Sequence, residues 1–162
     1  MLESQAIDVP PPKLRSMVAG TDDETWFLES GRRSVDDVKR ALAAVGRTLD
    51  SFTDILDFGC GCGRMARWLL GDPRCSLTGV DIDATMIEWC TEHLPGGRFE
   101  TNAGLPPTKY ADHSFDLVVN HSVFTHLDEE YQDRWLEELS RITRPDGVLV
   151  LSFSGDLPFA EH

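Results

Sequence analysis

The fold is decided by the stretch Ile55-Leu56-Asp57-Phe58-Gly59-Cys60-Gly61-Cys62-Gly63-Arg64, in which a short apolar run leads into alternating glycines. Such a pattern is typical of a buried strand that turns into a helix. Glycine adopts backbone angles closed to other residues and lets a ligand lie against the main chain. In an open parallel sheet, the turn after the first strand lies at the carboxyl edge, where ligands bind. A nucleotide-like cofactor is therefore expected beside this loop.

From Thr53 onward, short apolar runs alternate with helical patterns, which is typical of an α/β fold with parallel strands and crossover helices. Strands are expected at residues 54–58, 76–81, 98–101, 115–120 and 148–153. Helices are expected at residues 64–70, 84–93 and 129–142, the last ended by Pro145 and Gly147. Residues 103–114, which hold Pro106 and Pro107, are expected to form a loop.

The first fifty residues carry different signals. Pro10, Pro11 and Pro12 cannot enter a helix interior or a central strand, so an extended arm is expected up to about Gly20. A capping-box-like start at Ser34 and apolar residues at helical spacing predict a helix over residues 35–49. The chain therefore divides into an amino-terminal arm and capping helix, residues 1–50, and a cofactor-binding core, residues 51–162.

Composition limits the partners. A formal net charge of −13 argues against nucleic acid, which is bound by clustered Lys and Arg. No apolar run approaches the ~20 residues that span a bilayer, and residues 1–13 lack the pattern of a signal peptide, so a cytoplasmic protein without a membrane partner is expected. The four cysteines lack the paired spacing of a zinc site, and no metal is expected.

The charges near the glycine loop bear on the cofactor. A dinucleotide favours a G-x-G-x-x-G turn that opens a helix, whereas this loop is Gly59-x-Gly61-x-Gly63. Asp57 ends the preceding strand, where a carboxylate would repel phosphate and attract a cationic amino group. S-adenosylmethionine has an amino group and a sulfonium and no phosphate. These charges therefore favour it over NAD.

A second acidic residue, Asp81, ends the next expected strand, and a carboxylate there can accept hydrogen bonds from both ribose hydroxyls. Asp81 supports an adenosine ligand without separating NAD from S-adenosylmethionine. Ile82 and Met86 are candidates to pack on the adenine.

These motifs together resemble class I S-adenosylmethionine-dependent methyltransferases, a broad family that includes many small-molecule modifying enzymes. The matching segments are residues 57–64, 80–83, 115–127 and 144–151. The resemblance implies a doubly wound, Rossmann-like parallel sheet of order 3-2-1-4-5 with flanking helices. The family fold continues with a sixth strand and an antiparallel seventh, whereas only residues 154–162 remain here, so the core is expected to lack its last two strands. The apolar strand at 148–153 would then be an exposed edge, through which the chain could form a homo-oligomer.

The resemblance also implies contacts. The glycine loop would meet the methionine end of the cofactor, Asp81 the ribose, and Asn102 with Ala103 the adenine edge, where the family more often has Asp in place of Asn102. Residues after the fourth strand would line the cofactor and the methyl-transfer channel, and the amino-terminal segment would close over the site, with Arg15 offered to the methionine carboxylate. The expected cofactor contacts are Arg15, Asp57, Gly59, Cys60, Gly61, Cys62, Gly63, Arg64, Asp81, Ile82, Met86, Asn102, Ala103, Asn120, His121, Ser122 and Phe124.

The expected activity is methyl transfer from S-adenosylmethionine to a small-molecule acceptor by in-line displacement, with His121 as the first candidate for a general base. Two alternatives stay open at this point. One is an NAD-dependent oxidoreductase, which the glycine spacing and Asp57 disfavour. The other is a methyltransferase-like module that binds cofactor or a partner without catalysis.

Overall fold

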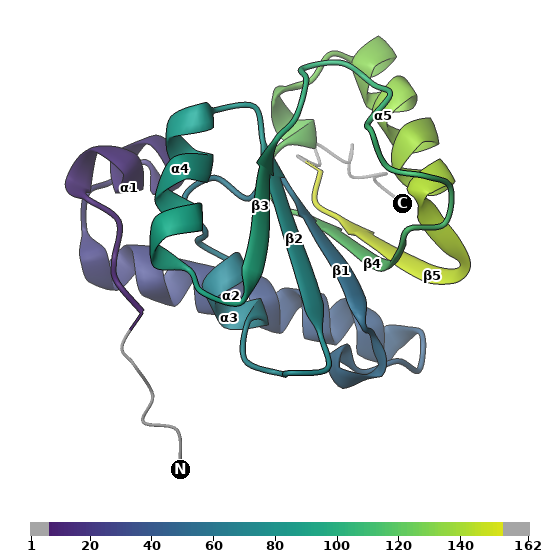
Figure 1. Cartoon of the computed structure of the whole chain (residues 1–162), viewed down its shortest axis with the longest axis horizontal. Coiled ribbons are helices and arrows are strands. Elements are labelled where there is room, and N and C mark those ends of the chain that lie inside the picture. The colour runs from purple at the N-terminus through teal and green to yellow at the C-terminus, as the bar shows by residue number, and fades with distance from the viewer. Residues whose placement is uncertain (1–6, 154–162) are drawn as a thin grey trace, which may run out of the picture.

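The computed structural model describes residues 7–153 and contains one five-stranded parallel sheet of order β3-β2-β1-β4-β5 (Figure 1). This confirms the predicted sheet order. The strands are β1 Asp54–Phe58, β2 Ser76–Asp81, β3 Gly97–Thr101, β4 Phe115–Asn120 and β5 Thr143–Leu151. In the centre of the sheet, Asp57 of β1 is in register with Gly79 of β2 and Val119 of β4, so the ends of the three strands meet at one edge.

The sheet is covered by helices on both faces (Figure 1). Neighbouring residues of β1 point to opposite sides, because side chains alternate along a strand. Ile55 packs with residues of α1, α2, α3 and α4, whereas Leu56 packs with Trp135 and Leu139 of α5. The central strands are buried on both faces, which is why they could be recognised as continuous apolar runs.

Three α-helices follow the glycine loop within residues 7–153. The second and third lie where they were expected, and the first is shorter than expected. Helices α4 and α5 span Ala84–His93 and Glu129–Ile142, as predicted. Helix α3, however, covers only Ala66–Leu69 rather than residues 64–70. Gly61 and Gly63 have φ of 53° and 80°, left-handed values that delay the helix.

The amino-terminal prediction was wrong in two respects. The expected extended arm contains helix α1, Pro12–Ala19, because proline is well tolerated in the first turn of a helix. Helix α2 spans Glu24–Ala44 rather than residues 35–49, and Asp23 caps it by accepting a hydrogen bond from the Trp26 backbone N–H. Ser34, the expected start, lies inside α2 and donates to the Ser30 carbonyl.

The fifth strand begins earlier than predicted. It follows α5 directly at Thr143, and an irregularity shifts its register between Phe115↔Thr143 and Leu117↔Val148. Pro145 and Gly147 lie in this irregular part of β5 rather than ending the helix. In the described part of the chain β5 pairs on one side only, with β4. Self-association through its other edge stays a prediction.

Two short 3-10 helices, η1 Leu49–Ser51 and η2 Phe124–His126, lie before β1 and after β4. Residues 103–114 form a loop without helix or strand, as predicted. Among residues 7–153, no helix combines the length and the apolar character that crossing a membrane requires.

Candidate cofactor-binding site

A cleft of about 560 Å³ opens at the carboxyl ends of the central strands. It is the place where parallel α/β sheets bind ligands, because the loops that follow neighbouring strands converge there. The predicted contact residues that line it are Asp57, Gly59, Cys60, Gly61, Arg64, Asp81, Ile82, Asn102, His121 and Ser122.

The glycine loop is held against β2 by backbone bonds. The N–H groups of Gly59 and Cys60 both donate to the Val80 carbonyl, at 2.8 and 2.9 Å. Gly59 has a φ of 80°, and a Cβ atom there would lie 2.1 Å from a Val123 methyl group. A larger residue would therefore strain the loop and push it away from the connection that follows β4.

Asp81 fastens the same loop from β2. One carboxylate oxygen accepts from the Gly61 N–H at 2.8 Å, and the other accepts from the Asp83 N–H at 2.9 Å. Each carboxylate oxygen can accept a second hydrogen bond, so the side chain can also receive ribose hydroxyls from the cleft. The Asn102 N–H donates to the Asp81 carbonyl at 3.0 Å, which fixes the start of the loop after β3.

Replacing Asp81 by alanine is expected to weaken S-adenosylhomocysteine binding by on the order of 1 to 3 kcal/mol, because two hydroxyls would lose their acceptor. Calorimetry measures this loss. Hydrogen exchange at the Gly61 amide reports the separate loss of loop order. Unchanged affinity with faster Gly61 exchange would leave Asp81 only the role of fastening the loop.

Two buried oxygens beside the loop have no hydrogen-bond donor among the described residues. They are Oδ2 of Asp57 and Oδ1 of Asn120. The Asn120 amide nitrogen donates to the Phe58 carbonyl at 2.7 Å, which fixes its orientation. Burial raises the pKa of Asp57 to about 7, against an opposing effect of the Arg64 charge. Buried acceptors without partners are costly, so this end of the cleft is suited to a ligand that brings N–H donors and positive charge.

Among the residues that the structure describes, Arg64 provides the only guanidinium in the lining of this cleft. Its guanidinium donates a long hydrogen bond to the Ser30 hydroxyl, at 3.4 Å. Helix α2 approaches the Arg64 backbone so closely that a Cβ atom on Gly31 would lie 2.1 Å from the Arg64 carbonyl oxygen. Burial lowers the pKa of Arg64, and the Asp57 carboxylate opposes that shift. Arg64 can therefore pair with an anionic group of a ligand.

Seven predicted contact residues do not line the cleft. Arg15 donates to the carbonyls of Asp22 and Pro10, which close the turns at the two ends of α1. Cys62 and Met86 lie in the core beneath α1 and α4, and Phe124 lies in the core beneath α5. The other three are Ala103, Gly63 and Asn120. Gly63 packs against Leu94, and Asn120 lies just under the loop.

Other lining residues were missed in the sequence. They are Met17, Val18, Phe58, Met65, Gly104, Val123, His126, Leu127 and Trp135. Val18 covers the loop so closely that a Cβ atom on Gly61 would lie 2.8 Å from its methyl group. The spacing of Leu14, Met17 and Val18 is helical and was a usable signal for α1. Trp135 belongs to the apolar face of α5, and its indole lies 4.7 Å from the Phe58 ring.

His121 lies in the cleft just after β4, and its pKa is lowered by burial and by the nearby Arg64 charge. A lowered pKa favours the neutral imidazole near pH 7. His121 can therefore accept a proton at that pH.

The sheet order, the glycine loop and the acids that end β1 and β2 define the class I fold of S-adenosylmethionine-dependent methyltransferases. Residues 56–151 match the model of the methyltransferase domain family, and the chain belongs to this family. One relative is the 2-methyl-6-phytyl-1,4-hydroquinone methyltransferase of Synechocystis, 30% identical over 65% of this chain and 33% of its own length. An uncharacterized protein of Rickettsia prowazekii is 29% identical, over 62% of this chain and 42% of its own. The chain thus spans less than half the length of these two relatives.

Solved structures agree. A TehB-like SAM-dependent methyltransferase from Corynebacterium glutamicum superposes with a TM-score of 0.54 at 26% identity, covering 74% of this chain and 72% of that one. PKMT2 from Rickettsia typhi, solved in complex with AdoHcy, has a TM-score of 0.52 at 27% identity, covering 60% and 20% of the two chains. The cofactor of the family is S-adenosylmethionine.

Proposed function

We propose that this chain binds S-adenosylmethionine in the cleft and transfers its methyl group to a small-molecule acceptor by in-line displacement. The observation that carries the proposal is Asp57 Oδ2, a buried acceptor in the lining of the cleft for which the described residues supply no donor. An ammonium group supplies N–H donors and the charge that an ionised Asp57 favours. A pyrophosphate would place anionic oxygens against acceptors, which disfavours NAD.

The lining residues support one orientation of the ligand. Asp81 is available to the ribose, and the exposed Ile82 and the neighbouring Asn102 offer an apolar surface and an amide to the adenine. Arg64 is the partner for the methionine carboxylate, since Arg15 is bonded to carbonyls outside the cleft. The ammonium then lies toward Asp57.

Arg64→Met is expected to weaken S-adenosylhomocysteine binding by about 10- to 100-fold, because a charge-assisted bond to the carboxylate is lost in a partly enclosed site. Arg15→Met is the matched control and should change affinity by less than about threefold, or ~0.7 kcal/mol. Calorimetry on both variants makes the comparison. A larger loss for Arg15→Met would reverse this assignment.

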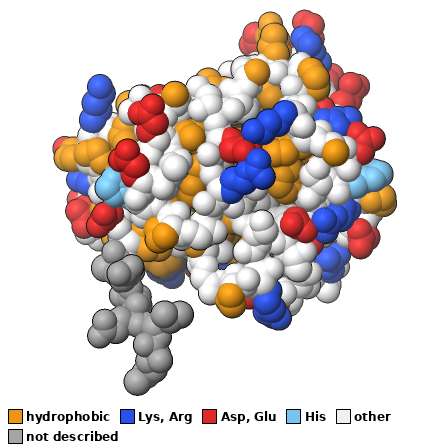
Figure 2. All heavy atoms as spheres, in the orientation of Figure 1, with side chains coloured by type: hydrophobic (Ala, Val, Ile, Leu, Met, Phe, Trp, Pro, Cys, Tyr) orange, Lys and Arg blue, Asp and Glu red, His pale blue; other side chains and the backbone are white. Residues whose placement is uncertain are grey.

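When bound, S-adenosylmethionine supplies a methyl group on a sulfonium, which is already an activated leaving group. The chain has to hold donor and acceptor in line, an effect that can lower a barrier by ~7 to 11 kcal/mol. Figure 2 shows acidic and basic side chains interspersed on the face in view, with no continuous basic surface. With the net charge of −13, this supports a small-molecule acceptor over nucleic acid. A cytoplasmic location stays a prediction.

His121 is the base that the proposal assigns to acceptors that must lose a proton. His121→Ala is expected to lower the methylation rate of such an acceptor by about 100-fold and to remove the inflection on the acid side of the pH profile. Because the pKa of His121 is lowered, that inflection should lie below the ordinary value of 6.5. Wild-type rates across the pH range would remove His121 from this role.

A comparison of S-adenosylhomocysteine with NADH by calorimetry tests the function as a whole. We expect binding of S-adenosylhomocysteine and none of NADH. Binding of NADH, or indifference to adenosyl sulfur compounds, would overturn the proposal. Cofactor binding without turnover across a broad panel of acceptors would indicate a non-catalytic module instead.

A further inference from the structure

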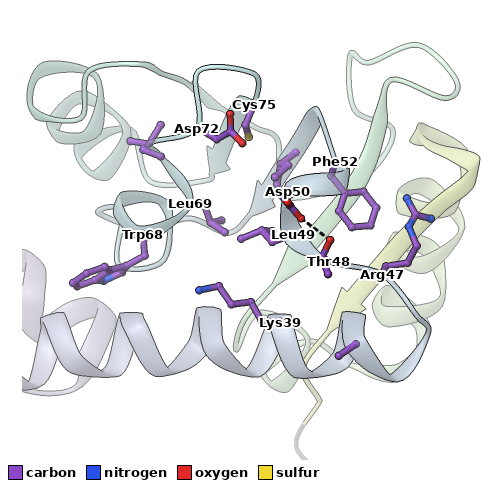
Figure 3. Close-up of a pocket in the computed structure, with 13 residues that line it drawn as sticks. Lys39, Arg47, Thr48, Leu49, Asp50, Phe52, Trp68, Leu69, Asp72 and Cys75 are labelled. Atoms are coloured by element: carbon purple, nitrogen blue, oxygen red, sulfur yellow. Dashed lines mark hydrogen bonds between the residues drawn. The ribbon is translucent and has the colours of Figure 1, made fainter. Parts of the chain in front are cut away.

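A second cavity, of about 470 Å³, lies at the amino ends of β1 and β2, at the opposite edge of the sheet from the cofactor cleft (Figure 3). It is bounded by α2, η1, α3 and the turn before β2. We call this cavity the base groove.

The floor of the base groove is apolar. Phe52, Ile55 and Leu69 are all buried and line it, and Trp68 forms a wall with 40% of its surface exposed. An exposed indole beside a buried apolar floor favours the hydrocarbon part of a ligand, because both partners lose contact with water when it binds. The volume suits a single aromatic ring with a short chain.

The acids at the rim already have partners. Asp72 accepts two bonds from Arg74, at 3.0 and 2.6 Å, and these bonds lower its pKa to about 2. Asp50 accepts from the Thr48 hydroxyl, as the dashed line in Figure 3 marks. The Asp72 charge is therefore matched by Arg74, whereas Asp50, bonded to a neutral hydroxyl, keeps its negative charge at the rim.

Lys39, by contrast, has no carboxylate within hydrogen-bond distance among the described residues. Figure 3 shows its side chain leaving α2 into the space between Trp68 and Leu49. Its ion-pair partner is Asp36, with Nζ and carboxylate oxygen 3.7 Å apart, which is beyond hydrogen-bond distance. The other cation, Arg47, donates to the Asp146 carbonyl and lies over the Phe52 ring at 4.5 Å. The cation available to a ligand at the base groove is thus the Lys39 ammonium.

We propose that the base groove binds a small amphiphilic carboxylate, with its ring or hydrocarbon on Phe52, Ile55 and Leu69 and its carboxylate at Lys39. This site is separate from the cofactor cleft and does not depend on the proposed methyl transfer. A neutral apolar ligand would leave the Lys39 ammonium without an anionic partner, and a cationic ligand would be repelled by it.

The chain contains a native reporter for this site. Cys75 lines the base groove and is partly exposed, whereas Cys60, Cys62 and Cys90 are buried. Burial raises the pKa of the Cys75 thiol, so its alkylation is measured at about pH 9, where more thiolate is present. A ligand in the base groove should slow alkylation of Cys75, with Cys75→Ser as the control for labelling elsewhere.

Calorimetry with three ligands of the same carbon skeleton tests the proposal: 4-phenylbutyrate, 4-phenylbutanol and 4-phenylbutylamine. We expect 4-phenylbutyrate to bind at least about tenfold more tightly than the other two, and to protect Cys75. Lys39→Gln should remove this preference, whereas Arg40→Gln, a neighbouring exposed cation outside the groove, should keep it.

A second pair of variants removes the space rather than the charge. Ala43 lines the base groove and Ala44 does not, although both are exposed on α2. Ala43→Trp should abolish binding of 4-phenylbutyrate, and Ala44→Trp should retain it. Equal affinity for the three ligands, unchanged binding by Ala43→Trp, or displacement by saturating S-adenosylhomocysteine would each overturn the proposal.

Discussion

Asp57→Asn is expected to weaken S-adenosylhomocysteine binding by about 100-fold, ~3 kcal/mol, while making the ligand-free protein more stable. The carboxylate is buried at 2% exposure, and its Oδ2 lacks a donor among the described residues. Its charge helps to bind a cation and at the same time opposes folding. Asparagine removes both effects in nearly the same shape.

The gain in stability depends on pH. The pKa of Asp57 is raised from 3.8 to about 7, so between these values the folded protein holds a proton that the unfolded chain has lost. Wild-type stability therefore falls as pH rises from about 4 to 7 and is then level. The advantage of Asp57→Asn should grow over the same window toward a ceiling of about 4 kcal/mol, the cost of three pKa units. Urea unfolding at pH 5 and pH 8 measures it.

Asp83→Asn is the matched control for this experiment. Asp83 also carries a negative charge near the cleft, but its carboxylate caps α4 by accepting from the Thr85 N–H, and asparagine caps equally well. Affinity and stability should change little. Equal losses of affinity in both variants would show that Asp57 acts only through the overall charge of the region. If Asp57→Asn were less stable than the wild type at pH 8, burial of the ionised carboxylate would not destabilise the protein.

Gly31→Ala is expected to destabilise the protein by about 3 kcal/mol, although alanine is the better helix former by ~1 kcal/mol. The added Cβ atom would lie 2.1 Å from the Arg64 carbonyl oxygen, a backbone atom that cannot rotate away. Helix α2 must then move from the loop that carries Arg64, and cofactor affinity should fall as well. Thermal unfolding should show a melting temperature lower by about 6 to 12 °C.

Gly104→Ala provides the control for this substitution. An added Cβ atom at Gly104 meets nothing within 4 Å, and its φ is not left-handed, so stability should change by less than about 0.5 kcal/mol. A stable Gly31→Ala protein with wild-type affinity would mean that α2 and the loop separate at little cost.

The sheet could be predicted because its central strands are buried on both faces. Residues of these strands are apolar on both faces, as at Leu56 and Leu117, so each strand is a continuous apolar run and its position follows from local sequence. The helix and strand boundaries that were predicted wrongly depend on contacts between distant parts of the chain or on the exact position of a residue in a helix. Pro12 begins a helix rather than preventing one, and β5 starts at Thr143 because it pairs with Phe115, a contact that spacing along the chain does not reveal.

The residues of the candidate site also divide into those that local sequence predicts and those that it does not. Asp57, Asp81 and His121 end parallel strands, so their convergence follows once the strands are identified. Val18 and Trp135 reach the cleft only because α1 and α5 pack where they do. Arg15 lies away from the cleft because the turns at the ends of α1 bring carbonyls to it.

The protonation of Asp57 also links ligand capture to the surrounding solvent. With a pKa of about 7, a fraction of the molecules carries a proton on this carboxyl at neutral pH. A cation that settles beside it favours the ionised form, so its arrival expels a fraction of a proton into the buffer. The heat recorded on mixing then includes the heat of protonating that buffer, and comparing phosphate with Tris, whose ionisation enthalpies differ, would count the expelled protons.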